Sequence, residues 1–280
     1  MTRRNFSQIL KDANIDIRRE YDRLYAMFYE HKIPDEFNNI YMTFKELCEM
    51  QFVSYPHRGT CLSLEDFNDF YGFNFEKKPE KFNIDYLVGF CEYTYNLLIY
   101  FHAGFCTSPF MANNPQQLFL SQINKVIESI GYMSTCDEGI TIFVPKSAEM
   151  IATSEIVDNK ISYKVIQYNH HSMKGDIEGK KAIILLMAGE LEGRRKELSG
   201  INKTLETNLF FLFNSVNLRH DNVGKNSNRY IEFISNMTID ELESWYDETY
   251  QLCLLAFLEL DNLERNKKIA ELKDNTGKGR

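Results

Sequence analysis

The stretch TIDELESWYDETYQLCLLAFLEL, residues 238–260, indicates the fold class because it has the pattern of a capped amphipathic helix. Thr238 is followed three residues later by Glu241, the spacing of a capping box in which each side chain accepts the other residue's backbone N–H. From Leu242 onward, apolar residues recur every three or four positions, which is the period of an α-helix. The pattern predicts one long helix from Thr238 to about Leu272.

The same helical period recurs along most of the chain. Only 14 Gly and 6 Pro interrupt the 280 residues, so helix breakers are few. Further helices are expected, in chain order, over residues 6–30, 35–53, 63–71, 84–105, 115–131, 150–157, 162–168, 176–198, 203–218 and 229–237. The segment 84–105 is apolar nearly all round, which is typical of a buried central helix.

Residues 131–147, GYMSTCDEGITIFVPKS, depart from the helical pattern. Gly139 breaks the stretch and a β-type run follows it, so we expect a small β-hairpin near residues 140–145. The same change of character marks the expected boundary between two helical domains, residues 1–132 and 133–280. The predicted fold is therefore mainly α, with helical bundle domains and one small hairpin.

Composition and charge narrow the class of protein. The net charge of −8 argues against a general nucleic-acid binder, which is usually basic. Residues 176–226 are the least acidic part, with eight Lys or Arg against seven Asp or Glu. We see no secretory signal and no apolar run long enough to span a bilayer. Because the six cysteines are scattered without a CxxC, we expect free thiols, a cytoplasmic location and no membrane partner.

The stretch FLFNSVNLRHDNVGKN, residues 211–226, places Arg219 beside His220 where an apolar helix is expected to end. An arginine binds phosphate bidentately and keeps its charge, and a histidine accepts a proton near neutral pH. Cleavage of RNA without a metal needs a base for the 2′-hydroxyl and a cation for the phosphorane, and this pair offers both. The alternative is structural, since a cation at a helix end complements the dipole, and Asn222 and Gly224 favour a turn.

This arrangement resembles the HEPN superfamily, and most of all its members linked to abortive infection and toxin–antitoxin systems. The resemblance covers about Asp176–Leu272 and rests on long helices around a polar Arg-His loop. Members carry an Arg, a polar residue and then a His a few positions later, and they build a composite cleft at a two-fold interface. The resemblance implies a bacterial defence- or toxin-type protein that binds RNA, or cleaves it as a metal-independent endoribonuclease, through Arg219 and His220.

The sequence departs from the family motif after His220. No histidine follows at Val223–Asn226 or anywhere beyond. Either His220 acts itself, with Asn222 or Lys225 as neighbouring substrate contacts, or the site is degenerate and binds RNA or a partner without cutting.

The apolar helices of the last third also favour self-association. Four successive apolar residues cannot all face one core, namely Phe210, Phe211, Leu212 and Phe213. A wide apolar band is usually covered by another element or another subunit, so a homo-oligomer is expected, with the N-terminal domain as the alternative cover. The competing functional class is a non-catalytic helical module that docks a partner protein.

A second candidate site is YNHHSMKGDIEGKK, residues 168–181, which groups His170, His171 and Lys174 just before an expected helix. A helix N-terminus attracts anions, so these side chains are candidates for binding the phosphate of a substrate. Adjacent histidines usually point in different directions, which disfavours one shared metal ion, and such residues are often ordinary loop residues.

The pairs His57–Cys61 and His102–Cys106 share a spacing that faces one way on a helix. Together, two His and two Cys would complete a tetrahedral zinc site. His57 falls in an expected loop, however, and scattered residues produce such pairs by chance. We therefore assign no metal site and expect no cofactor, and the sequence contains no glycine-rich phosphate loop, nucleotide fingerprint, GxSxG or HExxH motif.

Overall fold

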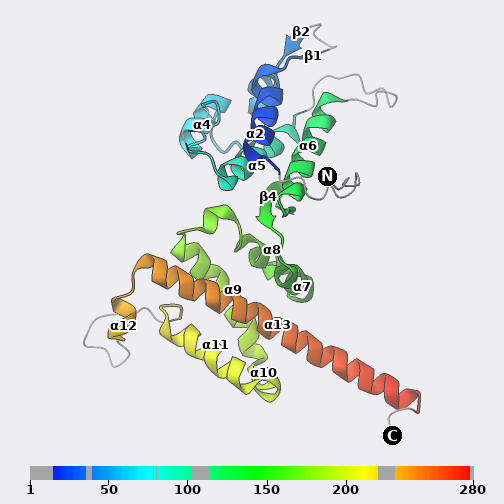
Figure 1. Cartoon of the computed structure of the whole chain (residues 1–280), viewed down its shortest axis with the longest axis vertical. Coiled ribbons are helices and arrows are strands. Elements are labelled where there is room, and N and C mark those ends of the chain that lie inside the picture. Colours follow the sequence, from blue (N-terminus) through cyan, green and yellow to red (C-terminus); the bar gives the residue numbers. More distant parts are fainter. Residues whose placement is uncertain are drawn as a thin grey trace, which may run out of the picture. The chain divides into compact units, whose positions relative to one another are not determined.

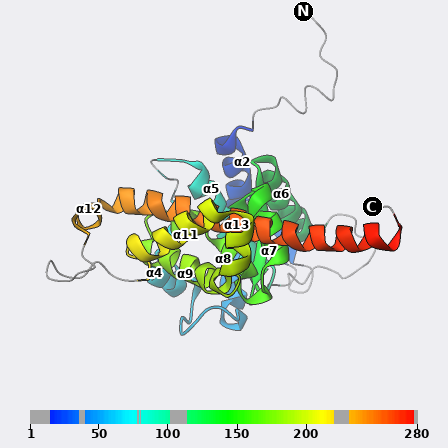
Figure 2. The ribbon, with the colours of Figure 1, turned by 90° about the horizontal axis from the view of Figure 1, so that it is seen from below.

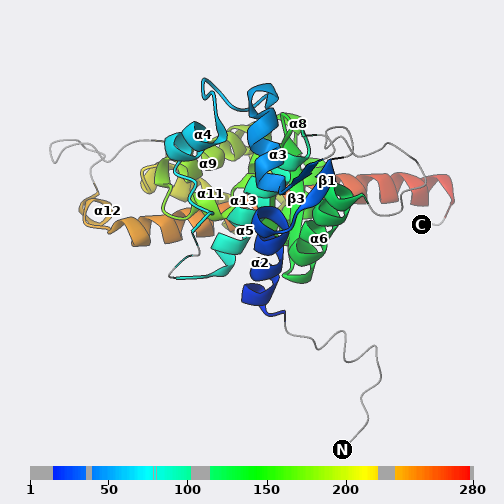
Figure 3. The same ribbon diagram turned by 90° about the horizontal axis from the view of Figure 1, so that it is seen from above.

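We describe the protein from a computed structural model, which describes residues 15–35, 40–77, 79, 81–101, 114–219 and 231–277. Figure 1 labels most of the elements, and Figures 2 and 3 show them from below and from above. The chain divides into two compact units, Met1–Phe143 and Val144–Arg280. The division falls inside the second strand of the hairpin, whereas the sequence indicated residue 132. No helix in the described ranges combines the length and the apolar character needed to cross a bilayer.

The N-terminal unit is a helical bundle with two short strand pairs. Its elements, in chain order, are α2 (Ile17–Tyr25), the π-helical turn η1 (Ala26–Glu30), β1 (Ile33–Asp35), β2 (Ile40–Met42), α3 (Phe44–Gln51), the 3-10 turn η2 (Phe52–Ser54), α4 (Leu64–Tyr71), α5 (Ile84–Leu98), α6 (Pro115–Ser129), β3 (Tyr132–Asp137) and β4 (Ile140–Pro145). Helices α2, α5 and α6 contact one another and lie together in Figure 3.

Aromatic rings fill the core of this unit. The Tyr21 and Phe90 ring centroids are 5.1 Å apart and nearly edge-on, and those of Phe28 and Phe119 are 6.1 Å apart. Such contacts add to the free energy that the rings gain by leaving water. They account for many of the Phe and Tyr residues of this unit.

Several helix starts in this unit agree with the sequence because their caps are local. The side chains of Ser63, Asn83 and Asn114 each accept a backbone N–H in the first turn of α4, α5 and α6. Those N–H groups have no partner inside the helix, so the caps satisfy them. Pro115 follows at the first helical position, where its missing N–H costs nothing.

The predicted hairpin is present as β3 and β4. Its two-residue turn has left-handed backbone at both Glu138 (φ 49°) and Gly139 (φ 83°), which suits the twist of a tight hairpin. A Cβ at Gly139 would collide with the Tyr100 hydroxyl, which donates to the Gly139 carbonyl at 2.9 Å. The Asn96 side chain bonds both the carbonyl and the N–H of Thr141, at 2.7 and 2.8 Å. These contacts attach the hairpin to α5.

One predicted helix start in this unit is wrong, and one predicted helix is too long, because α5 ends at Leu98 whereas the helix was expected to reach residue 105. A helix was expected over residues 35–53, beginning at Asp35. Instead, β1 and β2 form an antiparallel pair in which Ile33 faces Met42. The helix begins later, at Phe44, because Thr43 and Glu46 form a capping box. The pairing joins residues on both sides of the undescribed segment 36–39, so a local helical pattern could not reveal it.

The C-terminal unit is mainly helical in its described residues, which also include the end of β4, Val144 and Pro145. Its elements are α7 (Ala148–Ile156), α8 (Asn159–Gln167), the 3-10 turn η3 (His171–Met173), α9 (Ile177–Gly193), α10 (Arg195–Ile201), α11 (Lys203–Ser215), α12 (Glu232–Ser235) and α13 (Ile239–Asn275). Helix α13 contacts α7, α9, α10 and α11 and therefore organises the unit. The mainly α prediction with a small hairpin near 140–145 is confirmed.

Helix α13 starts at the predicted capping box and extends beyond the residues that pack against the rest of the unit. Thr238 and Glu241 cap each other's backbone as expected. The buried face extends from Tyr246 to Leu260, and residues 265–277 are all exposed. In Figure 2 this last part continues past α9 and α11. The 37 residues correspond to about 55 Å of helix at 1.5 Å per residue.

The region before α13 differs in detail from the expectation. One helix was expected over 176–198, but the chain leaves the helical conformation at Arg194 (φ −108°, ψ 13°) and α10 follows. Helix α11 ends at Ser215 and not at residue 218. Of the four successive apolar residues, Phe211 is 63% exposed while its three neighbours are buried. One core therefore covers all but one of them.

Candidate functional site

Arg219 is held just after α11 by two kinds of contact. Asn217 adopts a left-handed backbone (φ 57°), and the Arg219 N–H then donates to the Phe213 carbonyl at 3.0 Å. The guanidinium meets the Glu192 carboxylate on α9 with both terminal nitrogens, at 3.3 and 2.9 Å. It also lies over the Phe213 ring, 5.3 Å from the centroid. The side chain remains 21% exposed, so its fork is oriented yet reachable from solvent.

Arg219 also lies close to a second aromatic ring, Phe210, and another guanidinium contacts that ring. Arg195, at the start of α10, is 4.1 Å from the Phe210 centroid, and Arg219 is 5.7 Å from it. Arg195 and Lys203 both bind the carboxylate of Glu206, at 2.6 and 2.9 Å. Hydrogen bonds from Lys203 and Arg195 lower the pKa of Glu206, so this buried group carries its charge at neutral pH.

We call Arg195, Lys203 and Arg219 the cationic cluster. Its anchoring carboxylate, Glu206, is only 3% exposed, whereas the Arg195 and Lys203 side chains are 50% and 72% exposed. The negative charge is therefore buried and the positive charges face solvent. Two planar guanidinium forks and an ammonium group have the donor chemistry that binds phosphate oxygens.

The other residues of the predicted Arg-His loop cannot be placed. His220, Asn222 and Lys225 all lie outside the described residues. Of the candidate Arg-His pair, the structure describes Arg219 alone. The sequence did not indicate its ion pair with Glu192 or its contacts with Phe rings. The sequence signal that could have found the neighbours of Arg219 is the charge pattern of 192–206, where Glu, Arg and Lys alternate.

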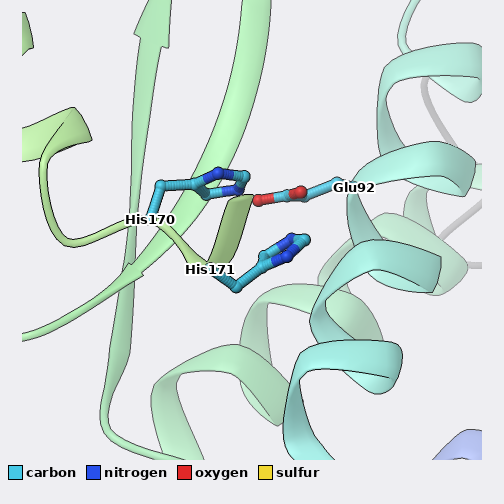
Figure 4. A group of neighbouring side chains, drawn as sticks. All are labelled: Glu92, His170 and His171. Carbon is cyan, nitrogen blue, oxygen red and sulfur yellow. The ribbon is translucent and has the colours of Figure 1, made fainter. Parts of the chain in front are cut away.

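The second predicted site, His170, His171 and Lys174, lies in a tight turn between α8 and α9. We call residues 168–175 the histidine turn. The His170 and His171 ring centroids are 4.1 Å apart (Figure 4), so the adjacent rings lie side by side and do not diverge as expected. Lys174 is exposed. The N-terminus of α9 that was to attract an anion is capped by the carboxylate of Asp176, which accepts the Gly179 N–H at 2.9 Å.

Glu92, which Figure 4 also labels, belongs to α5 of the N-terminal unit. There its Oε1 atom accepts a hydrogen bond from the Phe143 N–H at 2.6 Å.

A buried lysine supports the histidine turn, and sequence reasoning missed it. Lys180 on α9 is 7% exposed, and its ammonium binds Glu243 at 2.7 Å and Asp247 at 2.6 Å, both on α13. The Tyr168 hydroxyl donates to the same Asp247 oxygen at 2.9 Å, and the Gly175 N–H donates to Glu243 at 2.9 Å. Because Lys180 donates a hydrogen bond to Glu243, the pKa of that carboxyl is lowered.

Stacking completes this support. The Tyr168 ring lies parallel to Tyr250, with centroids 3.9 Å apart. Burial raises the pKa of both phenols, so they remain neutral hydrogen-bond donors. We call Tyr168, Lys180, Glu243 and Asp247 the lysine network. It fixes both ends of the histidine turn on α13.

The zinc alternative receives no support from the residues that are described. His57 forms a hydrogen bond with the Tyr100 hydroxyl at 3.0 Å, and its ring packs edge-on against both Tyr55 and Tyr100. Within the described ranges, neither His57 nor Cys61 belongs to a group of three metal-ligating side chains. His102 and Cys106, the other two expected ligands, fall outside those ranges.

No family model, curated protein or solved structure matches this chain.

Proposed function

We propose that the C-terminal unit binds RNA, and that the cationic cluster contacts its phosphates. The observation that carries the proposal is that the guanidinium groups of Arg195 and Arg219 both lie close to the Phe210 ring, at 4.1 and 5.7 Å from its centroid. Two guanidinium groups that each pack on this ring have lost part of their rotamer freedom before a ligand arrives. Binding a phosphate then costs less conformational entropy than it would on two free side chains.

Electrostatics favours the same ligand. Glu206 is buried beneath two of the cations, while Glu192, which pairs with Arg219, is 56% exposed. A phosphate can replace Glu192 as the bidentate partner of Arg219, because both present two oxygens in one plane to the fork. The carboxylate thus orients the guanidinium for a phosphodiester of the same geometry.

Cleavage is the second part of the proposal, and it adds His220. In this mechanism the His220 imidazole takes the proton from a ribose 2′-hydroxyl, and that oxygen attacks the adjacent phosphorus. Arg219 neutralises the charge that develops on the phosphorane. The 5′-oxygen leaves with a proton from the imidazolium, and a 2′,3′-cyclic phosphate remains.

Fluorescence anisotropy with a labelled single-stranded RNA tests the binding. Arg219→Ala is expected to weaken binding about tenfold, which corresponds to about 1.4 kcal/mol, the loss expected for a charge-assisted contact. Arg219→Lys should recover only part of this loss, because an ammonium lacks the fork. The matched control is Arg265→Ala, which removes an exposed arginine from α13 of the same unit. Equal affinities for wild type and Arg219→Ala would contradict the proposal.

Cleavage is tested separately with the same RNA in the presence of EDTA. Wild-type protein is expected to produce cyclic-phosphate ends, and His220→Ala is expected to retain binding while losing cleavage. If wild-type protein binds but releases no product, the cluster is a binding surface and the catalytic part of the proposal is wrong.

A different observation favours a second candidate function, a helical interaction module. Residues 265–277 of α13 are exposed, and Ile269 and Leu272 on this segment are 48% and 62% exposed. Exposed apolar side chains on a projecting helix are suited to packing against another chain. Sedimentation of the protein and of a chain ending at Arg265 would test it, because self-association through this segment requires the shortened chain to be a monomer.

A further inference from the structure

The two histidines of the histidine turn are arranged unlike most sequence neighbours. In an extended chain, consecutive side chains point to opposite sides. Here His170 has extended backbone (φ −68°, ψ 144°) and His171 begins the 3-10 turn η3. This change of conformation brings the second ring round to the first, with a centroid separation of 4.1 Å and an angle of 45° between the ring planes. One nitrogen of each ring lies within 4.8 Å of one on the other.

The His170 ring is buried, and Ser172 holds its orientation. It is 8% exposed, and its Nδ1 atom is 2.7 Å from the Ser172 Oγ atom. The same Nδ1 atom accepts the Ser172 backbone N–H at 3.3 Å, so two contacts with Ser172 fix the orientation of the ring. Contacts of this kind to one ring nitrogen hold a metal-ligating imidazole in place.

The turn itself is held rigidly. Backbone hydrogen bonds close it, from the His170 N–H to Gln167 at 2.9 Å and from the Met173 N–H to His170 at 2.9 Å. The lysine network then fixes its two ends, through the Tyr168 hydroxyl and the Gly175 N–H. A ligand pair on such a support loses little freedom when it binds an ion, which raises affinity.

We propose that His170 and His171 bind one divalent transition-metal ion of the zinc class through their imidazole nitrogens. Imidazole suits Zn²⁺, Ni²⁺ and Cu²⁺ and is a poor ligand for Mg²⁺ or Ca²⁺. Two nitrogens that bind one ion at about 2.1 Å lie within about 4.2 Å of each other, so from a separation within 4.8 Å the rings rotate toward the ion when it binds. Water fills the remaining positions, so the ion is exchangeable. This site is separate from the cationic cluster and does not depend on RNA binding.

Calorimetric titration of the full chain, without a histidine affinity tag, with Zn²⁺ and then with Mg²⁺ tests the proposal. The chain has four other histidines and an exposed cysteine, Cys136, so each variant is compared with wild-type protein. We expect about one Zn²⁺ per chain and no Mg²⁺ binding at the same concentration. His170→Ala and His171→Ala should each lower the Zn²⁺ affinity at least tenfold. His31→Ala, which removes an exposed histidine from the N-terminal unit, is the control and should change nothing.

Two further measurements keep the test decisive. Ser172→Ala should lower Zn²⁺ affinity about tenfold through loss of the ring's second contact, while leaving the number of ions unchanged. Circular dichroism and the melting temperature without metal show whether each variant is folded, and a folded His170→Ala chain is required. The proposal is overturned if wild-type protein binds no Zn²⁺, or if the folded double variant His170→Ala/His171→Ala binds it as tightly as wild type.

Discussion

The lysine network and the cationic cluster solve opposite electrostatic problems within one unit. In the first, the cation Lys180 is buried, and the half-exposed Asp247 shares it with Glu243. In the second, the carboxylate Glu206 is buried and its cations face solvent. Both contain one buried ion with two partners of opposite charge. They differ in which sign is presented to the outside.

That difference separates a structural role, in the lysine network, from a role in ligand binding, in the cationic cluster. A buried cation with its charge satisfied joins α9 to α13 and leaves no positive charge for a ligand. A buried carboxylate attracts cationic side chains to the surface above it and holds them in place. We therefore expect changes in the lysine network to affect stability, and changes in the cationic cluster to affect RNA binding.

Lys180→Met is the strongest way to break this comparison. It leaves Glu243 and Asp247 close together without a cation, and removing one member of a buried ion pair is expected to cost about 3 kcal/mol. Chemical denaturation should show this loss of unfolding free energy. The RNA affinity of the folded fraction should remain within about twofold of wild type, which is the precision needed to resolve a lost contact. A tenfold drop in RNA affinity would show that the two regions are not separate.

Acid should reveal the carboxylates of both regions. Pairing with Lys180 lowers the pKa of Glu243, and hydrogen bonds from Lys203 and Arg195 lower that of Glu206. A carboxyl with a lowered folded pKa contributes stability above its ordinary value, 4.5, and loses it as the pH falls through the folded pKa. Denaturation curves between pH 7 and pH 3 should show this loss, and Lys180→Met should lose the share that Glu243 contributes. A flat profile in wild-type protein would contradict the assignment.

Thr238→Ala sharpens the comparison with a purely local contact. Thr238 accepts the Glu241 N–H at 3.2 Å and caps α13. Its loss should lower the unfolding free energy by about 1 kcal/mol, less than Lys180→Met, and leave RNA binding unchanged. An unaltered melting temperature would mean that the first turn of α13 contributes nothing to the stability of the unit.

Arg195→Ala should have the smallest effect on stability. Its side chain is half exposed, and Lys203 still pairs with the buried Glu206 carboxylate when Arg195 is removed, so the loss should be about 1 kcal/mol or less. The same change removes one of the two guanidinium groups on Phe210, so RNA binding should weaken. A variant that loses stability but keeps its RNA affinity would place Arg195 with the structural contacts.

Sequence reasoning succeeded where the controlling contact is local. The caps of α4, α5, α6 and α13 depend on residues two or three positions apart, so a single sequence reveals them. The hairpin followed from Gly139 and the β-type run after it. These features do not depend on what the rest of the chain does.

Sequence reasoning failed where the partner of a residue is distant along the chain. Asp247 is 67 residues from Lys180, so nothing in the local sequence indicated that tertiary contacts bury this lysine. The pairing of β1 with β2 and the partnership of Arg219 with Glu192, 27 residues away, are of the same kind. The closeness of His170 and His171 is local but depends on a backbone turn that residue type alone does not specify.

The salt dependence of RNA binding tests the central claim most directly. Each phosphate contact on a single strand releases counterions and contributes a slope of about −0.7 to the logarithm of the binding constant against the logarithm of salt concentration. The account predicts that Arg219→Ala and Arg195→Ala each make the slope shallower by about 0.7, and that Arg265→Ala leaves it unchanged. Identical slopes for wild type, Arg195→Ala and Arg219→Ala would contradict the claim that the cationic cluster contacts phosphate.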